Sequence, residues 1–210
     1  MNEEELNYLL YNIPSNVDYT DIPSEIDLED VPIERIDKLK ELLNVKNKDL
    51  VFDVSRLLTS WGVKEGFDTL KKLFMNDELQ GMIQHRLRNY DDTYKHVLDS
   101  FLGYRAVQAD LGYDEKARQD MFEPISKIIK ASNVQPFEIS GLFYLITNKE
   151  FNEYIPLLKE HLKTIIKHPE QNYWKIKDAI DLFLKIEPNF VQEALTENNM
   201  KLEDYEGKVK

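Results

Sequence analysis

The chain has 210 residues, a net charge of -12 at pH 7 and no cysteine. Apolar residues make up 42% and aromatic residues 11%, which is enough to build a core, and the lack of cysteine excludes disulfides and thiolate metal sites. Such an acidic chain repels phosphate backbones and anionic membrane surfaces. We therefore expect no direct nucleic-acid ligand and no membrane association, and we favour a basic protein as partner.

The negative charge is concentrated at the N-terminus. Residues 1–34 contain ten carboxylates and no lysine or arginine, and so carry -10 of the net charge. Residues 35–210 are nearly balanced, with 29 acidic and 27 basic side chains. This division predicts an acidic N-terminal segment or cap over residues 1–34 and a separate domain over 35–210.

The acidic segment is not one continuous helix. Its three prolines, Pro14, Pro23 and Pro32, disfavour helix at the residues that precede them. We predict a short helix near residues 4–11, then extended chain with turns, then a helix through residues 34–44. The apolar side chains of the segment are expected to cover the first helical hairpin while its carboxylates face solvent.

Two helices joined by a tight turn are predicted next. Residues 49–62 carry apolar side chains at steps of three and four, a stripe that ends at Gly62. Residues 63–74 repeat this spacing with Phe67, Leu70 and Phe74 on one face. The short link predicts an antiparallel helical hairpin.

The remaining chain repeats this pattern. Further helices are predicted over 91–112, 114–132, 136–146, 151–168, 173–186 and 188–199. Starts near residues 49, 93 and 136 are 44 and 43 residues apart, which is typical of HEAT or armadillo units. The pattern predicts an all-α fold, a short right-handed α-solenoid of HEAT-like hairpins, with an irregular closed bundle as the alternative.

Prolines mark several of the predicted helices. Pro136 and Pro188 are expected at helix starts. Pro124 and Pro156 occupy similar sequence contexts in two second helices, where proline either begins or kinks a helix. They are predicted at matching points early in those helices.

No catalytic or metal-binding pattern stands out. The four histidines lack the spacing of helical metal ligands, glycine-rich phosphate loops are absent, and there is no nucleophile elbow. We therefore predict no cofactor, no metal and no enzymatic activity. The acidic start of the chain and its short apolar runs lead us to expect a cytoplasmic protein.

The linker over residues 85–96, HRLRNYDDTYKH, is rich in arginine, aspartate and tyrosine. Ion pairs within it would fix the angle between two hairpins. The alternative is a binding role, because tyrosine and arginine often carry binding energy at interfaces. On that interpretation Tyr90, Asp91 and Asp92 are candidate partner-binding residues.

Three stretches resemble one known family. The sequences LLTSWGVKEGFDTLKKLF, HRLRNYDDTYKH and EPISKIIKASNVQPFEISGLFYLI look like those of HEAT-like immunity proteins, which bacteria encode beside polymorphic toxins. The resemblance spans roughly residues 49–198 and implies a non-enzymatic protein that binds a cognate toxin and blocks it. No functional residue carries over by position, because such proteins recognise partners through differing surfaces.

The sequence thus predicts an immunity protein that neutralises a basic toxin domain, with a nuclease as a candidate, and that acts as a monomer. The alternative is a non-enzymatic scaffold or adaptor that binds a cellular protein. Carboxylates of the N-terminal segment would steer the partner and tyrosines would anchor it. The candidate residues in this segment are Tyr11, Asp18, Tyr19, Asp21, Glu25, Asp27, Glu29 and Asp30.

Overall fold

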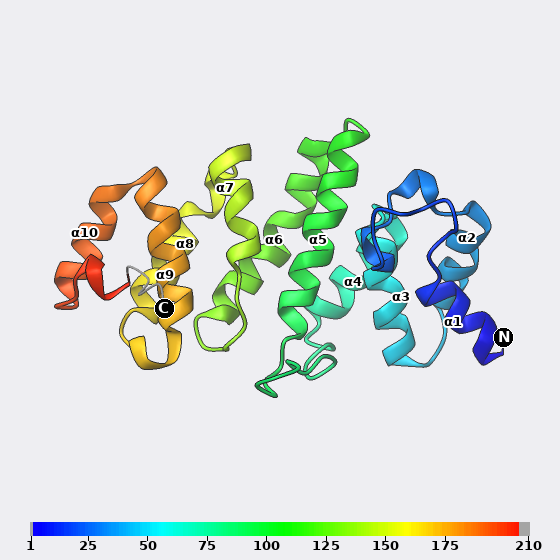
Figure 1. Ribbon diagram of the computed structural model, residues 1–210, viewed down its shortest axis with the longest axis horizontal. Helices are drawn as coiled ribbons and strands as arrows, with labels where there is room; N and C mark the ends of the chain where they lie inside the picture. The colour runs from blue at the N-terminus through cyan, green and yellow to red at the C-terminus, as the bar shows by residue number, and fades with distance from the viewer. Residues whose placement is uncertain (1, 206–210) are drawn as a thin grey trace. The chain divides into compact units, whose positions relative to one another are not determined.

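The computed structural model describes residues 2–205, and this part of the chain is all-helical (Figure 1). It contains no β-strand, only one isolated bridge between Gln84 and Asp91. The α-helices are α1 Glu3–Tyr11, α2 Ile33–Leu42, α3 Lys48–Ser60, α4 Lys64–Met75, α5 Thr93–Asp110, α6 Asp114–Ser132, α7 Phe143–Lys149, α8 Ile155–Ile165, α9 Pro169–Ile186 and α10 Pro188–Glu197. Five short 3-10 helices accompany them: η1 Pro23–Glu25, η2 Leu28–Asp30, η3 Ser140–Leu142, η4 Asn152–Tyr154 and η5 Leu202–Asp204.

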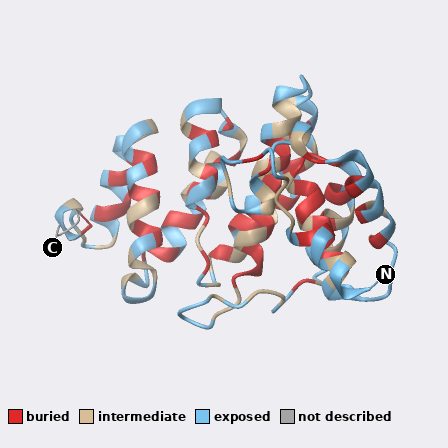
Figure 2. Ribbon diagram, turned by 45° about the vertical axis from the view of Figure 1, so that its right-hand side comes forward, coloured by how far each residue is buried: buried red, intermediate tan, exposed pale blue. Residues whose placement is uncertain are grey.

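The chain forms two compact units, Met1–Pro124 and Ile125–Lys210. The acidic segment belongs to the first unit. Most helices present a buried stripe to their neighbours within a unit and an exposed face to solvent (Figure 2). The all-α prediction is confirmed.

The N-terminal segment has the predicted succession of elements. α1 begins after Asn2, whose side chain accepts a hydrogen bond from the backbone N–H of Glu5 at 2.8 Å, a typical N-cap. The chain then runs through η1 and η2, and Pro23 opens η1. α2 follows directly after Pro32. The prediction of two helices separated by a turn-rich stretch is confirmed.

Apolar side chains of this segment share a core with the following helices. Buried members from the segment and from α2, α3 and the turn after α3 are Leu9, Leu10, Val17, Ile26, Val31, Ile36, Leu39, Leu42, Val54, Leu57, Leu58, Trp61 and Val63. By contrast, Ile22 and Ile33 are exposed. The burial stabilises a segment that has only short helices of its own.

Two polar side chains tie the segment to this core. Arg35 is only 2% exposed; its Nε donates to the carbonyl of Leu9 at 2.8 Å and its Nη1 to that of Asn12 at 2.7 Å. Its guanidinium lies 4.9 Å from the centre of the Trp61 ring, a cation-π contact. The Trp61 indole N–H donates to the carbonyl of Pro23 at 2.7 Å. The segment is therefore held at both α1 and η1.

α3 and α4 form the predicted hairpin, and α5 packs against α3. Gly62 turns the chain between α3 and α4 with φ of 75°, a conformation that glycine adopts readily. Gly66 in α4 lies directly against the backbone of Leu58 and Thr59. A side chain at Gly66 would separate the two helices.

Pro124 lies well inside α6, whereas Pro156 stands in the first turn of α8. The prediction of matching early positions is therefore wrong. Proline has no N–H, so Pro124 leaves the carbonyl of Asp120 without its usual helical donor. The Lys71 ammonium from α4 donates to that carbonyl at 2.8 Å, and this contact offsets the missing bond.

The structure corrects several predicted helix starts in the second unit: α8 begins at Ile155 and α9 at Pro169, where 151 and 173 were predicted. Residues 136–139 are not helical; the chain enters η3 at Ser140 and α7 at Phe143. Phe137 and Ile139 are buried in this non-helical stretch, and Ile139 has an extended φ of -124°. Burial of these two side chains outweighs the local signal of proline for a helix start.

Candidate functional site

The acidic residues of the N-terminal segment have two different roles. The Tyr19 hydroxyl accepts from the backbone N–H of Asp27 at 2.6 Å and lies 3.2 Å from Asp30 Oδ2 as a donor. Asn16 donates to the other oxygen of Asp30 at 3.1 Å. Tyr19 and Asp30 therefore brace the segment internally and hold the backbone at Asp27.

Several predicted site residues do face solvent. Asp18, Asp21, Glu25, Asp27 and Glu29 are exposed, and Glu25 accepts from the Thr20 hydroxyl at 3.1 Å. Among the described residues, no lysine or arginine forms an ion pair with any of these five. Their negative charge is available to a partner.

Two of them line a hollow with the end of α5. The hollow has a volume of about 400 Å³ and is lined by Asp27, Leu28, Glu29, Val107, Asp110 and Leu111. Asp27, Glu29 and Asp110 are exposed, and among the apolar residues of the lining Leu111 is 53% exposed. The C-terminal end of a helix adds negative potential at the same place. We call these six residues the acidic hollow.

The acidic hollow suits a basic side chain. Lysine and arginine place their aliphatic stems on apolar surface while the charged group stays near water and carboxylates. Asp27 and Glu29 were predicted from the sequence, whereas Asp110, Val107 and Leu111 were not. Those three lie about eighty residues further along the chain, and no local pattern connects them with η2.

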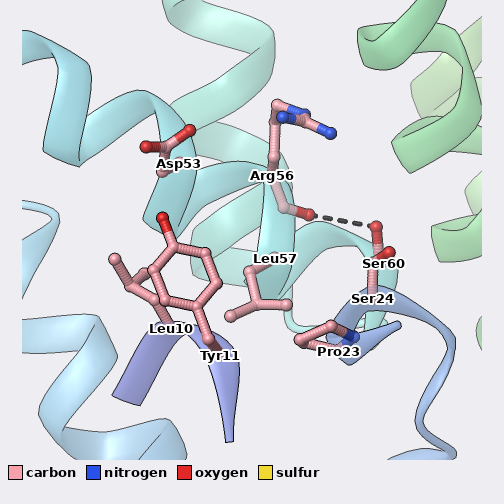
Figure 3. A pocket seen from close by; sticks show the side chains of 8 residues that line it. All are labelled: Leu10, Tyr11, Pro23, Ser24, Asp53, Arg56, Leu57 and Ser60. Atoms are coloured by element: carbon pink, nitrogen blue, oxygen red, sulfur yellow. Dashed lines mark hydrogen bonds between the residues drawn. The ribbon is translucent and has the colours of Figure 1, made fainter. Parts of the chain in front are cut away.

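Tyr11 lies at a different, smaller hollow of about 150 Å³ (Figure 3). Leu10, Pro23 and Leu57 contribute apolar surface there, and Arg56 and Asp53 contribute charge. The Arg56 guanidinium lies 5.4 Å from the Phe52 ring centre, and its buried Nε has no hydrogen-bond partner in the described chain. Tyr11 is 62% exposed and is not brought together with the acidic hollow.

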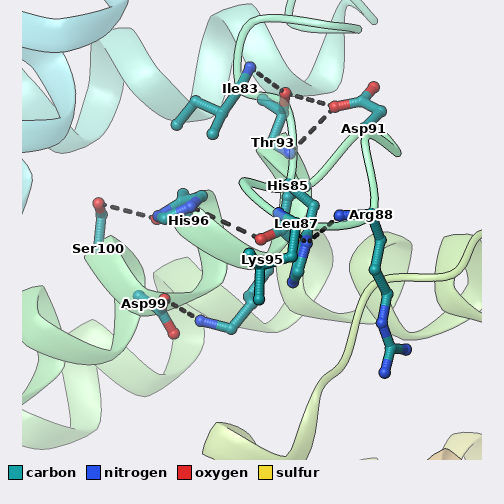
Figure 4. A network of polar contacts seen from close by, with 11 residues as sticks. Ile83, His85, Leu87, Arg88, Asp91, Thr93, Lys95, His96, Asp99 and Ser100 are labelled. Carbon is teal, nitrogen blue, oxygen red and sulfur yellow. Dashed lines mark hydrogen bonds and ion pairs between the residues drawn. The ribbon is translucent and has the colours of Figure 1, made fainter.

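Contacts of the three candidate residues hold the linker in shape, and Figure 4 shows those between Asp91 and Thr93. The Asp91 carboxylate accepts from the backbone N–H of Gly81 at 2.8 Å and from the N–H and hydroxyl of Thr93 at 3.0 and 2.5 Å. Asp92 is buried, with its carboxylate 3.7 Å from His96. The Tyr90 ring packs 4.5 Å from that of His85. These contacts engage the Asp91 carboxylate within the chain, whereas Asp92 Oδ1 is buried and has no hydrogen-bond partner among the described residues. The role of the three residues in binding stays a prediction.

A buried polar cluster in the second unit includes His161 and Lys175, and their partners Asn133 and Gln135 line an open hollow of about 340 Å³. His161, 1% exposed, donates from Nδ1 to Asn133 Oδ1 at 2.7 Å, and the Ser132 hydroxyl lies 3.2 Å from the same nitrogen. The Lys175 ammonium donates to the carbonyls of Ser132 and Gln135. The adjoining cavity has no room for a water molecule. The Ser132 hydroxyl donates to the carbonyl of Ile129 at 2.8 Å, so this serine and histidine belong to an internal hydrogen-bond network.

The described residues contain no group of three or more histidine, aspartate or glutamate side chains placed to hold a metal ion. Within the same part of the chain, no helix has both the length and the apolar character needed to cross a membrane. Comparison of the chain with protein-family models, curated proteins and solved structures finds no match.

Proposed function

We propose that the protein is a non-enzymatic inhibitor of the immunity type, which binds a basic toxin domain in the cytoplasm and occludes its active site. The observation that carries this proposal is the acidic hollow, whose lining combines the exposed residues Asp27, Glu29 and Asp110 with three apolar residues and includes no lysine or arginine. A nuclease is a suitable target, because its phosphate-binding groove is basic.

The fixed position of the carboxylates supports the proposal. Arg35 and Trp61 fasten the N-terminal segment to the core, and Tyr19 and Asp30 brace it internally. Charges that are already in place require little ordering when a partner binds. They also attract an oppositely charged partner before contact, which raises the association rate.

Neutralising the hollow is expected to slow binding. In the variant Asp27→Asn, Glu29→Gln, Asp110→Asn, association with a basic toxin domain should be about tenfold slower at low ionic strength, and the difference should shrink as salt rises. Asp30 is left unchanged because it accepts two internal hydrogen bonds. Rates are measured by stopped-flow or surface plasmon resonance against the product of the reading frame adjacent to the gene.

The matched control removes three exposed carboxylates of the second unit, Glu193→Gln, Glu197→Gln and Glu203→Gln. It has the same net charge as the test variant and should associate at nearly the wild-type rate. Both variants should melt within about 2 °C of wild type, because exposed substitutions of this kind change stability little. Equal association rates for the two variants would refute the role of the hollow.

Protection of growth tests the wider proposal. Expression of the adjacent gene's product should arrest cells, co-expression of this protein should restore growth, and the hollow variant should protect less well. If the product of the adjacent gene is harmless and deletion of this protein has no phenotype, the inhibitor proposal is contradicted and the adaptor alternative is favoured. Turnover of any substrate by the purified protein would contradict both.

A stacked, HEAT-like arrangement of hairpins is part of the proposal, because an extended curved surface suits a macromolecular partner. Such an array predicts a radius of gyration above about 20 Å in solution, whereas a closed globule of this length has about 17 Å. Small-angle X-ray scattering measures this quantity directly. A value near 17 Å would favour the closed bundle.

A further inference from the structure

The loop between α4 and α5 presents a basic, apolar tip. Leu87 is 88% exposed and is flanked by Arg86 and Arg88, which are also exposed. Neither arginine forms an ion pair with the described residues. In a chain of net charge -12, residues 86–88 form an isolated positive patch around an exposed leucine, and we call them the basic tip.

Hydrogen bonds to His85 hold the basic tip in place, as Figure 4 shows at Arg88. His85 Nδ1 accepts from the backbone N–H groups of Leu87 and Arg88 at 3.3 and 3.1 Å. The N–H of His85 donates to the carbonyl of Tyr90 at 2.7 Å, and that of Asn89 to the carbonyl of His85 at 2.9 Å. Asn89 adopts φ of 54° to complete the turn. A loop ordered in advance loses little entropy on binding.

The acidic hollow complements this tip in both charge and polarity. Its carboxylates, Asp27, Glu29 and Asp110, match the two arginines, and its apolar floor matches Leu87. The tip cannot reach the hollow of its own chain. The loop precedes α5 and the hollow is at the end of α5, and a helix of 18 residues is about 27 Å long.

We propose that the basic tip of one copy of this chain docks into the acidic hollow of a second copy. A two-fold axis perpendicular to α5 exchanges the two ends of that helix, so each tip meets the other copy's hollow and the assembly closes at two chains. Both features belong to the first unit, so their separation is set by one compact body. The like net charges of the two copies are screened beyond about 8 Å at physiological salt, and the opposite charges at contact decide the pairing.

Dimerisation would control access to the acidic hollow, which is proposed above to bind the toxin domain. This regulatory role rests on the proposed function. Each dimer covers both acidic hollows, and the monomer is the form that binds a basic partner. A basic partner then competes with the tip for the same carboxylates. The interface is small, so the dimer is weak and reversible.

Self-association is tested with the purified full-length chain alone, so the result does not depend on any toxin. In sedimentation equilibrium at about 0.15 M salt and protein concentrations on the order of 0.1–1 mM, the average mass should rise from 24.8 kDa towards twice that value. Arg86→Glu with Arg88→Glu should weaken association at least tenfold. The control Lys46→Glu with Lys167→Glu changes charge equally at exposed sites elsewhere and should associate nearly as wild type.

A charge exchange makes the test specific. The variant Asp27→Lys, Glu29→Lys should also be monomeric alone. Mixed with Arg86→Glu, Arg88→Glu, it should form a heterodimer, because both tip-hollow contacts then pair opposite charges again. Wild type that stays at 24.8 kDa throughout, or a mixture that fails to associate, would overturn the proposal and leave the toxin-binding proposal untouched.

Discussion

Lowering the pH from 7 to 4 is expected to destabilise the second unit by about 3 kcal/mol through His161 alone. Burial, assisted by the charge of Lys175, lowers the pKa of His161 to about 3, while an unfolded histidine titrates near 6.5. Well above pH 6.5, the His161 side chain is neutral in both the folded and the unfolded state. Below pH 6.5, His161 binds a proton in the unfolded chain but not in the folded chain. The free energy of unfolding therefore decreases progressively as the pH falls from 6.5 towards 3.

The contribution of His161 is isolated by comparing variants. His161→Gln retains a donor for Asn133 and cannot titrate, so its stability should fall by about 3 kcal/mol less than that of wild type between pH 7 and 4. His168→Gln changes an exposed histidine of the same unit and should leave the wild-type pH dependence intact. Hydrogen exchange should place the acid-induced opening within residues 125–205. Parallel pH profiles for wild type and His161→Gln would contradict this account.

Gly66→Ala is expected to destabilise the first unit by about 3 kcal/mol, which corresponds to a fall of about 10 °C in Tm. A Cβ at this position would lie 2.4 Å from Leu58 Cβ and 2.9 Å from the backbone nitrogen of Thr59. Backbone atoms cannot rotate away as a side chain does, so α3 and α4 must separate. Thermal and chemical denaturation monitored by circular dichroism measure the loss.

Gly103→Ala provides the matched comparison, since it makes the same substitution within another helix of the first unit. Its Cβ would approach the backbone of Ser60 no closer than 3.4 Å, an ordinary contact. Alanine has the higher helix propensity, so this variant should be unchanged or more stable by up to about 1 kcal/mol. If the two variants melted together, the close approach of α3 and α4 would not be what requires glycine at position 66.

Helices with a clear apolar stripe were predictable from the sequence. The residues at which helices begin and end were less predictable. α3 and α4 are found where three- and four-residue spacing and Gly62 place them. The helix start at Pro136 was wrong because two nearby side chains, Phe137 and Ile139, are buried in non-helical chain. Similarly, Pro124 inside a helix and Pro156 at a helix start have similar sequence contexts. The local sequence does not reveal that a lysine from α4 donates to the carbonyl that Pro124 leaves free.

The candidate site was also predictable only in part from the sequence. The concentration of carboxylates in residues 1–34 identified Asp27 and Glu29 as candidates, because such a concentration is evident from the sequence alone. It did not separate them from Asp30, which is engaged by Tyr19 and Asn16. Asp110 was missed because its neighbours in sequence carry no sign of the hollow. The two arginines of the basic tip are evident in the sequence. The hydrogen bonds to His85 that hold the tip in place are not.

The amino-acid sequence by itself determined the helical character, the placement of most helices and the concentration of negative charge in residues 1–34, because these depend on side-chain periodicity, turn residues and charge along the chain. Only the tertiary structure decided which carboxylates are available to a partner and which are engaged internally. It also placed Asp110 beside Asp27 and Glu29. Such pairings depend on burial and on contacts between distant segments, such as the packing of Arg35 on Trp61.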